Sequence, residues 1–222
     1  AMDAITTGDF NTAVGKDAGS EITTGSQNTA VGHQALLNED TGSRNTAIGE
    51  GSLLTLNFDG NGYNVGLGYN SGHLLSSGTQ NTFIGGQAGD SLTSGDDNVV
   101  LGFNAMSSAD GSESRNVAIG STTLAAMNNS TSNYNVAVGF NAGAAVTTGT
   151  HNTIAGGLAG DGLTLGADNV VLGYQALSAV NAGSKSVAIG SGTLAVQQTS
   201  FAITGCRPTS GSAVVTLSLI HI

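Results

Sequence analysis

The sequence predicts an all-β protein, a parallel β-solenoid of about eleven rungs that are each 17–19 residues long. The first observation behind this expectation is composition: 35 of 222 residues are glycine, tryptophan is absent, and aromatic residues make up 5%. Small and branched apolar residues carry the hydrophobicity, which suits many thin layers better than one thick core. The second observation is a short recurring motif, and the third is a longer period above it. Self-similarity at a fixed period is typical of repeat architectures.

The short motif opens with Asn, continues with Thr or Val, a small residue and an aliphatic residue, and closes with Gly. Its copies are spaced by 17, 17, 19, 17, 17, 18, 19, 17, 17 and 17 residues, and the last copy opens with Ser186. Glycine closes all eleven copies, so each copy marks one rung. The ten motif asparagines are Asn11, Asn28, Asn45, Asn64, Asn81, Asn98, Asn116, Asn135, Asn152 and Asn169.

Each rung is expected to contain two short strands. Period-two alternation of β-branched residues in the motif, as in 12–14 and 117–119, predicts the first strand. The closing Gly is expected to end it, because Gly tolerates a positive φ. Glycine stands again three residues before the motif Asn in eight of the eleven copies, which predicts a closing turn. The second strand is expected to run to an apolar residue of the following segment, which is Ile22, Leu75, Leu92, Val146 or Leu163.

Successive rungs are expected to stack in parallel. At about 4.8 Å per rung, eleven rungs give a rod roughly 50 Å long. Equivalent asparagines would then lie one above another, and each could hydrogen-bond to the next as in the Asn ladders of stacked sheets. We therefore interpret the motif asparagines as a structural ladder and not as ligand residues.

Four rungs form a longer unit of 70–71 residues. The sequence of 81–125 recurs in similar form at 152–195. At the eighth residue after the motif Asn, two successive rungs with Gly are followed by two with Leu or Met. Two longer turns, 55–63 and 126–134, fall at the same place in successive units. Their Asn, Phe and Tyr residues are types that bind sugars. The alternative is that the two tyrosines only pack the longer turns. The candidate ligand residues are Phe58, Asn61, Tyr63, Asn128, Asn129 and Tyr134.

Both faces of the predicted motif strand are apolar, since the third residue is Ala, Val, Phe, Ile or Gly. One face is expected to fill the coil and the other to meet another copy of the chain. The second residue, Thr in five rungs and Val in six, is expected to point inward. A thin coil buries little apolar surface against the entropy of ordering it. A homo-oligomer is therefore expected.

The motif resembles the head repeats of trimeric autotransporter adhesins, the YadA-like or Hep/Hag type. The resemblance is carried by NTAIG at 45–49, NVAIG at 116–120 and SVAIG at 186–190, and it covers residues 4 to about 205. The NTAVG variant is also similar to repeats of phage tail-fibre proteins. The resemblance implies a left-handed parallel β-roll, a homotrimer, and an extracellular place on a bacterial cell surface or virion. The rungs are longer than the family's, which predicts larger turns, and the family's neck, stalk and anchor are missing from these residues.

The repeat is expected to form a single domain over residues 1–205, with a degenerate rung at 201–205 and a non-repeat tail at 206–222. The first residues resemble those before Asn152, so we expect the sequence to start inside a rung. Its last six residues, LSLIHI at 217–222, match one reading frame of a transposon adapter used in sequencing libraries. We expect these six to be adapter-derived and the gene to come from an environmental, metagenomic read.

Charge and reactive residues exclude several classes of function. A net charge of −10 disfavours nucleic acid, the single Cys206 can form no internal disulfide, and no apolar run approaches the ~18 residues of a membrane span. No metal or catalytic cluster is predicted from the histidines, which fall at different rung positions: His33, His73, His151 and His221. The acids of the turns are interpreted as solvated and not as paired glycosidase acids; they are Glu39, Asp40, Asp59, Asp96, Asp97 and Asp168.

The leading functional expectation is a non-enzymatic surface fibre segment that attaches to a host-surface glycan or protein. A purely structural spacer rod is the alternative. GGQAGD at 85–90 and GGLAGD at 156–161 are faintly similar to a calcium-binding nonapeptide, so calcium binding is a remote alternative. Ice binding through Thr arrays is another. No catalytic residue and no cofactor other than this calcium is predicted.

Overall fold

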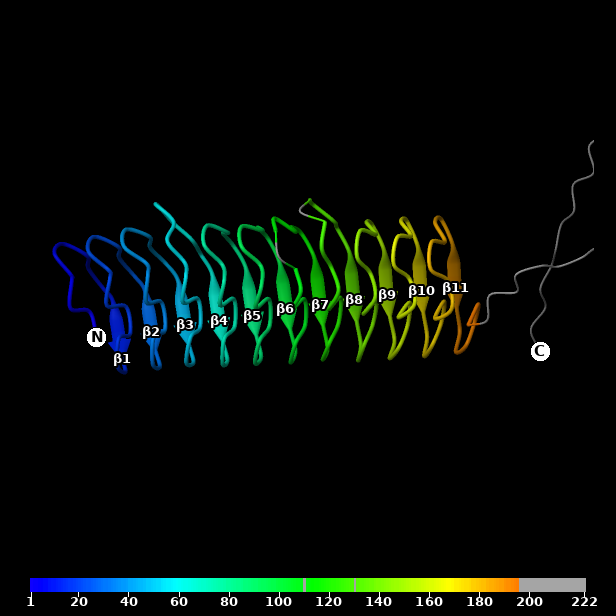
Figure 1. The fold of residues 1–222 in the computed structure, drawn as a ribbon, viewed down its shortest axis with the longest axis horizontal. Helices are drawn as coiled ribbons and strands as arrows, with labels where there is room; N and C mark the ends of the chain where they lie inside the picture. Colours follow the sequence, from blue (N-terminus) through cyan, green and yellow to red (C-terminus); the bar gives the residue numbers. More distant parts are fainter. Residues whose placement is uncertain (110, 130, 196–222) are drawn as a thin grey trace, which may run out of the picture.

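The computed structural model describes residues 1–109, 111–129 and 131–195, which form a rod of stacked coils (Figure 1). Eleven three-residue strands form one parallel sheet in chain order. The predicted all-β solenoid is therefore confirmed. The described part has no helix long and apolar enough to cross a membrane. The strands are β1 (Thr12–Val14), β2 (Thr29–Val31), β3 (Thr46–Ile48), β4 (Val65–Leu67), β5 (Thr82–Ile84), β6 (Val99–Leu101), β7 (Val117–Ile119), β8 (Val136–Val138), β9 (Thr153–Ala155), β10 (Val170–Leu172) and β11 (Val187–Ile189).

Successive strands pair in register, motif residue for motif residue. Thr29 of β2 pairs with Thr12 of β1 and with Thr46 of β3. The same register holds across the longer rungs, where Thr46 pairs with Val65. The additional residues of these rungs therefore lie in the turns and leave the sheet unchanged. The degenerate rung at 201–205 and the tail at 206–222 lie outside the described residues.

The second strand expected in each rung is absent from the described residues, so that prediction was wrong. The segment after the motif Gly folds into consecutive turns in which alternate residues have a left-handed backbone, with φ of 59° at Gln34 and 53° at Leu36. Hydrogen bonds between rungs continue through these turns. The amide of Gln34 donates to the carbonyl of Lys16 in the preceding rung at 3.0 Å. The amide of Leu36 donates to Ser52 in the following rung, also at 3.0 Å, so the backbone groups are satisfied without strand dihedrals.

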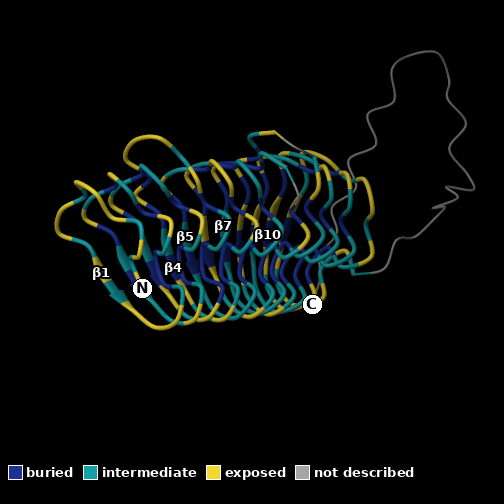
Figure 2. Cartoon of the chain, turned by 60° about the vertical axis from the view of Figure 1, so that its left-hand side comes forward, coloured by how far each residue is buried: buried dark blue, intermediate teal, exposed yellow. Residues whose placement is uncertain are grey.

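The core is a continuous column of side chains inside the coil. Buried residues recur from rung to rung along the rod (Figure 2). The third motif residue points inward: Ala30, Phe83 and Val100 are fully buried. The second and fourth residues point outward: in β11 they are Val187, which is 67% exposed, and Ile189, which is 60% exposed. The expectation that the second residue points inward was therefore wrong. Alternation requires only that neighbouring side chains point to opposite sides, and the narrow coil favours the position where Ala is most common.

The four-rung period is a packing pattern in which large side chains lie against glycines. The ring of Phe83 lies where a Cβ on Gly72 or Gly89 would come within 2.7 or 2.3 Å of its atoms. Four rungs later, Ile154 packs in the same way: a Cβ on Gly143 or Gly160 would lie 3.0 or 3.3 Å from its Cδ1. One large strand residue is thus accommodated by glycines in its own rung and in the preceding rung.

Candidate functional site

The motif asparagines form a buried ladder along the rod. The backbone N–H of Asn28 donates to Oδ1 of Asn11 at 2.9 Å, and Nδ2 of Asn28 donates to the carbonyl of Gly42 at 2.8 Å. Equivalent bonds join each motif Asn to the next and end where Ser186 N–H donates to Asn169. The predicted ladder is present, and within it only Nδ2 of Asn45 is buried without a hydrogen-bond partner in the described part of the chain.

The two longer turns project from the same edge of the rod, after β3 and after β7 (Figure 1). In the first of them, Phe58 is partly buried and packs against the core, while Asn61 is exposed and forms a bridge to Ser43 of the preceding rung. In the second, Asn128 is exposed. Phe58 therefore holds its turn, and Asn61 and Asn128 face solvent.

Asn129 forms hydrogen bonds within its own turn and to both neighbouring rungs. Its backbone N–H donates to Oε1 of Glu113 at 2.8 Å, and its Oδ1 accepts from Nδ2 of Asn133 at 2.6 Å. Its Nδ2 donates to the carbonyl of Thr148 at 3.3 Å. Asn129 thus positions the turn between two neighbouring rungs.

Tyr63 and Tyr134 are about half exposed and precede a motif Asn, at a position with a left-handed backbone. The Arg44 guanidinium lies 5.5 Å from the Tyr63 ring centre and donates to its hydroxyl at 2.8 Å. Arg115 lies in the same way 5.6 Å from Tyr134. His151 stacks on Tyr134 from the following rung at 5.4 Å and 11°. Both faces of Tyr134 are therefore covered by protein, a contact the sequence pattern did not indicate.

Glu39 is fully buried, so its interpretation as a solvated turn residue was wrong. It occupies the rung position held by Ile22 in the preceding rung and Leu56 in the following rung, and its Oε1 accepts from the Gly42 amide at 2.8 Å. Burial raises the pKa of Glu39 to about 7, an effect that nearby Asp59 increases and backbone N–H groups partly offset. Glu113 is also fully buried, below the second longer turn, where it accepts from Gly111 and Asn129.

The raised pKa of Glu39 predicts a pH-dependent stability. Between its ordinary value of 4.5 and about 7, the folded chain keeps a proton that the unfolded chain has released. Raising the pH through this window therefore lowers the free energy of unfolding. Urea unfolding at several pH values should show that Glu39→Gln removes part of this decline and is more stable than wild type near pH 8. Glu50→Gln at an exposed site is the control; equal pH slopes for Glu39→Gln and wild type would contradict the prediction.

A row of exposed aromatic side chains, which the sequence analysis missed, follows the motif glycines. We call Tyr69, Phe103, Phe140 and Tyr174 the aromatic row; each is 55–58% exposed. They stand at one rung position in alternate rungs, and Gly86, Ser121 and Gly157 fill the same position in the rungs between. The signal in the sequence was a Tyr or Phe directly after the motif Gly in every second copy from the fourth to the tenth.

The outer sheet face, made of the second and fourth residues of the strands, is the other exposed apolar surface. Its aliphatic side chains run along the whole length of the sheet. Its large, clearly exposed members are Val14, Ile48, Leu67, Val99, Leu101, Val136, Val138, Val170, Leu172, Val187 and Ile189.

No family model matches the chain. No curated protein and no solved structure is significantly similar to it either. Its function must therefore be inferred from its own surface.

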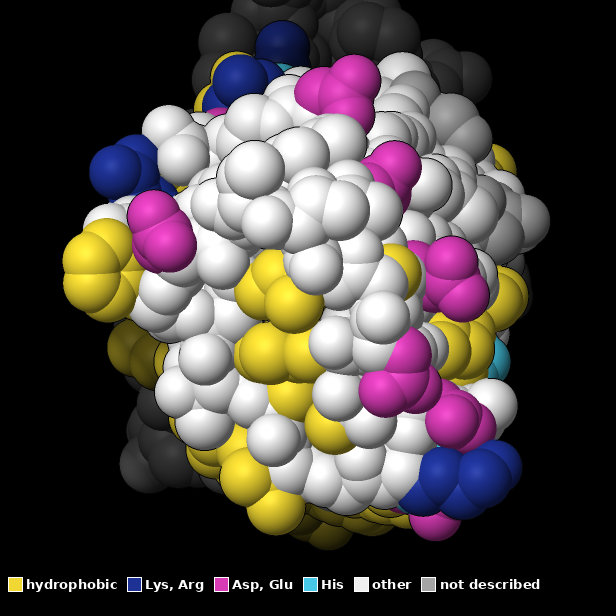
Figure 3. Space-filling model, turned by 90° about the vertical axis from the view of Figure 1, so that its left-hand side faces the viewer, with side chains coloured by type: hydrophobic (Ala, Val, Ile, Leu, Met, Phe, Trp, Pro, Cys, Tyr) yellow, Lys and Arg dark blue, Asp and Glu magenta, His cyan; other side chains and the backbone are white. Residues whose placement is uncertain are grey.

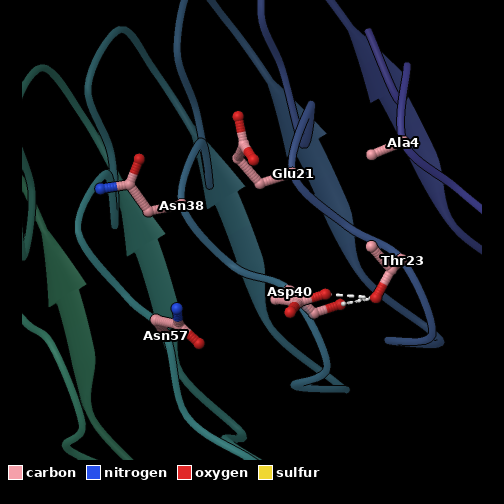
Figure 4. Close-up of a pocket in the computed structure, with 6 residues that line it drawn as sticks. All are labelled: Ala4, Glu21, Thr23, Asn38, Asp40 and Asn57. Atoms are coloured by element: carbon pink, nitrogen blue, oxygen red, sulfur yellow. Dashed lines mark hydrogen bonds between the residues drawn. The ribbon is translucent and has the colours of Figure 1, made fainter.

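A shallow hollow near the β1 end is lined by acids and amides (Figure 4). Its lining is Ala4, Glu21, Thr23, Asn38, Asp40 and Asn57. The Thr23 hydroxyl donates to the Asp40 carboxylate across the hollow. Seen from this end, Asp and Glu side chains are spread around the rim and apolar side chains occupy the centre (Figure 3).

Metal-ligating residues do not gather in the described part of the chain, where no three or more His, Cys, Asp or Glu come together. Asp90 and Asp161, from the two GGxAGD segments, lie four rungs apart, and burial raises the pKa of each. The described histidines have separate partners: His33 lies 3.7 Å from Glu50, His73 contacts Gly51 and His151 stacks on Tyr134. Cys206 and His221 lie outside the described residues.

Proposed function

We propose that the chain is a non-enzymatic segment of an extracellular fibre, an adhesin head or a phage tail-fibre shaft, that attaches to a host-surface glycan or protein. The observation that carries this proposal is a rod with an apolar outer sheet face along its length and two longer turns at equivalent rungs. Such a rod presents surface groups at fixed intervals along its length.

The outer sheet face supports assembly with copies of the chain. Contiguous exposed apolar patches of this length are rare on monomers and mark interaction surfaces. The large members of the outer sheet face range from 38% exposed at Ile48 to 67% exposed at Val187. We propose a homotrimer in which three such faces meet along a shared axis, as the resemblance to adhesin heads implies.

The longer turns support attachment. They repeat after four rungs, about 19 Å along the rod at the usual spacing of parallel strands. Asn61 and Asn128 are exposed there, and the tyrosines present a hydroxyl and a ring edge beside Arg44 or Arg115. These groups donate and accept hydrogen bonds in the way that sugar hydroxyls require.

A spacer rod without a ligand is the second candidate. The covered faces of Tyr134 favour it, since a ring between Arg115 and His151 offers no free face to a sugar.

The outward Thr residues of β1, β2, β3, β5 and β9 are also what an ice-binding face would use, but Val replaces Thr on the other six strands.

The test is a glycan array with the wild-type chain and with a variant whose 55–63 and 126–134 turns are replaced by the short turns of neighbouring rungs. Attachment through the turns predicts array signal for the wild type and loss of that signal for the variant. Light scattering on the same samples should give the mass of three chains for both. A blank array for the wild type, or an unchanged signal after both replacements, would remove the turns from recognition, and a monomer mass would remove the trimer.

A further inference from the structure

The aromatic row is a rigid array with a fixed interval. Because its four residues occupy one position of an in-register parallel coil, they stand in a line along the rod. Backbone bonds fasten each rung to the next at this position: Gln87 donates to the carbonyl of Tyr69 at 2.8 Å, and Asn104 donates to Gly86 at 3.1 Å. At about 4.8 Å per rung, the rings recur every ~9.6 Å.

The small residues between the rings keep this interval open. The ring of Phe103 leans over Gly86, where a Cβ would lie 3.5 Å from its Cδ2. Tyr174 leans over Gly157 in the same way, with a distance of 3.6 Å. The rings therefore rest against the backbone of the preceding rung, yet each side chain remains more than half exposed.

The strip beside the rings is uncharged, and all of its residues except Leu158 are polar. The residue after each ring or small residue is partly or fully exposed, and between Tyr69 and Tyr174 neither position carries a charge. These neighbouring residues are Asn70, Gln87, Asn104, Thr122, Asn141, Leu158 and Gln175. Amide groups can both donate and accept hydrogen bonds.

We propose that the aromatic row binds an extended, neutral β-1,4-linked polysaccharide of the cellulose or chitin class. In such a chain every second sugar presents the same apolar face, so that face recurs once per disaccharide, an interval close to that between the rings. The amide side chains alongside the row form hydrogen bonds with the sugar hydroxyls. The net charge of −10 disfavours polyanionic glycans. This inference rests on the proposed attachment function and names the glycan class, but it moves recognition from the turns to the row.

The row spans six rung intervals, about 29 Å. Calorimetry should therefore show affinity that rises from the disaccharide to the hexasaccharide of cellulose or chitin, and the wild type should sediment with the insoluble polymers. Replacing all four rings by Ala should abolish sedimentation. A hexasaccharide presents the same face three times and therefore reaches three of the four rings. Replacing an inner ring, Phe103 or Phe140, should weaken hexasaccharide binding about three- to tenfold, the scale of one aromatic stacking contact.

A matched variant tests the spacing itself. Phe103→Ser combined with Ser121→Phe keeps four rings but moves one of them by a single rung. The proposal requires that this variant lose most of the increase in affinity that the wild type shows from the disaccharide to the hexasaccharide. Equal affinity for this variant and wild type, or no binding of either polymer by the wild type, would overturn it.

Two further outcomes distinguish glycan binding by the aromatic row from glycan binding by the turns and from an interface between copies of the chain. If Tyr63→Ala with Tyr134→Ala removes polysaccharide binding and the four-ring variant retains it, the turns recognise the glycan and the row does not. If the four-ring variant loses mass in light scattering and still sediments with the polymer, the row is an interface between copies of the chain. An array signal that depends on the turns would leave the proposed attachment function standing in either case.

Discussion

Gly102→Ala is expected to disrupt the centre of the rod. Gly102 closes the motif of β6 with φ of +141°, a conformation that L side chains rarely adopt. A Cβ there would lie 2.3 Å from the carbonyl oxygen of Gly120, which is backbone and cannot rotate away. We expect a loss of at least ~3 kcal/mol in the free energy of unfolding, from backbone strain and the clash together. Urea unfolding followed by circular dichroism measures it.

Gly157→Ala is the matched control. Its φ lies outside the left-handed region, and a Cβ would meet only the Tyr174 ring at 3.6 Å, an ordinary contact. This variant should unfold within about 0.5 kcal/mol of the wild type. Similar unfolding midpoints for Gly102→Ala and Gly157→Ala would show that the stacked motif glycines are not sterically required.

Asn98→Ala should produce the second large loss. Oδ1 of Asn98 accepts from the backbone N–H of Asn116 at 3.0 Å, and its Nδ2 donates to Oδ1 of Asn81 and to the carbonyl of Glu113. All of these groups are buried, so truncation leaves donors and acceptors that water cannot reach. Unsatisfied groups cost about 1–3 kcal/mol each, which gives an expected loss of about 3 kcal/mol or more.

Asn57→Ala provides the comparison at an exposed Asn. It should change the unfolding free energy by less than about 0.5 kcal/mol. If Asn98→Ala unfolds with the midpoint of Asn57→Ala, the ladder contributes no measurable stability. Because each rung contacts only its neighbours, hydrogen exchange should place the loss around β5 to β7.

The period of the rod and the hydrogen-bond ladder were readable from the sequence because they repeat. Eleven copies of one motif leave a single in-register stack, and a buried Asn at the same place in ten rungs has the next rung as its partner. The places of the longer turns followed from the same alignment. The period, the register and the partner of each motif Asn are therefore predictable without any structure.

The direction of the side chains and the path after the motif were not readable. Alternation gives the period of a strand but not its phase, and both sets of motif residues are apolar here. Leu36 at φ 53° and Leu53 at φ 48° adopt a left-handed backbone that no propensity assigns to Leu. The neighbouring rungs impose this backbone by holding the amide of Leu36 on Ser52.

The candidate site was predicted only in part. The turns project as expected, but the Arg44 contact with Tyr63 requires knowing that the residue before the motif Asn points outward. Glu39 looked like a turn acid because Asp40 and a Gly turn follow it. Only the stacked structure places its side chain in the column that holds Leu56 one rung later.

The packing of Phe83 between Gly72 and Gly89 has a consequence for how such a chain changes length. Removing 81–97 alone would delete the ring together with Gly89 and leave the space at Gly72 unfilled. Removing 81–151 would instead bring Ile154 between Gly72 and Gly160, a neighbourhood like the one it has now. Insertions and deletions that preserve the core therefore come in blocks of four rungs. Unequal recombination between similar blocks can then lengthen or shorten the rod without redesigning any contact.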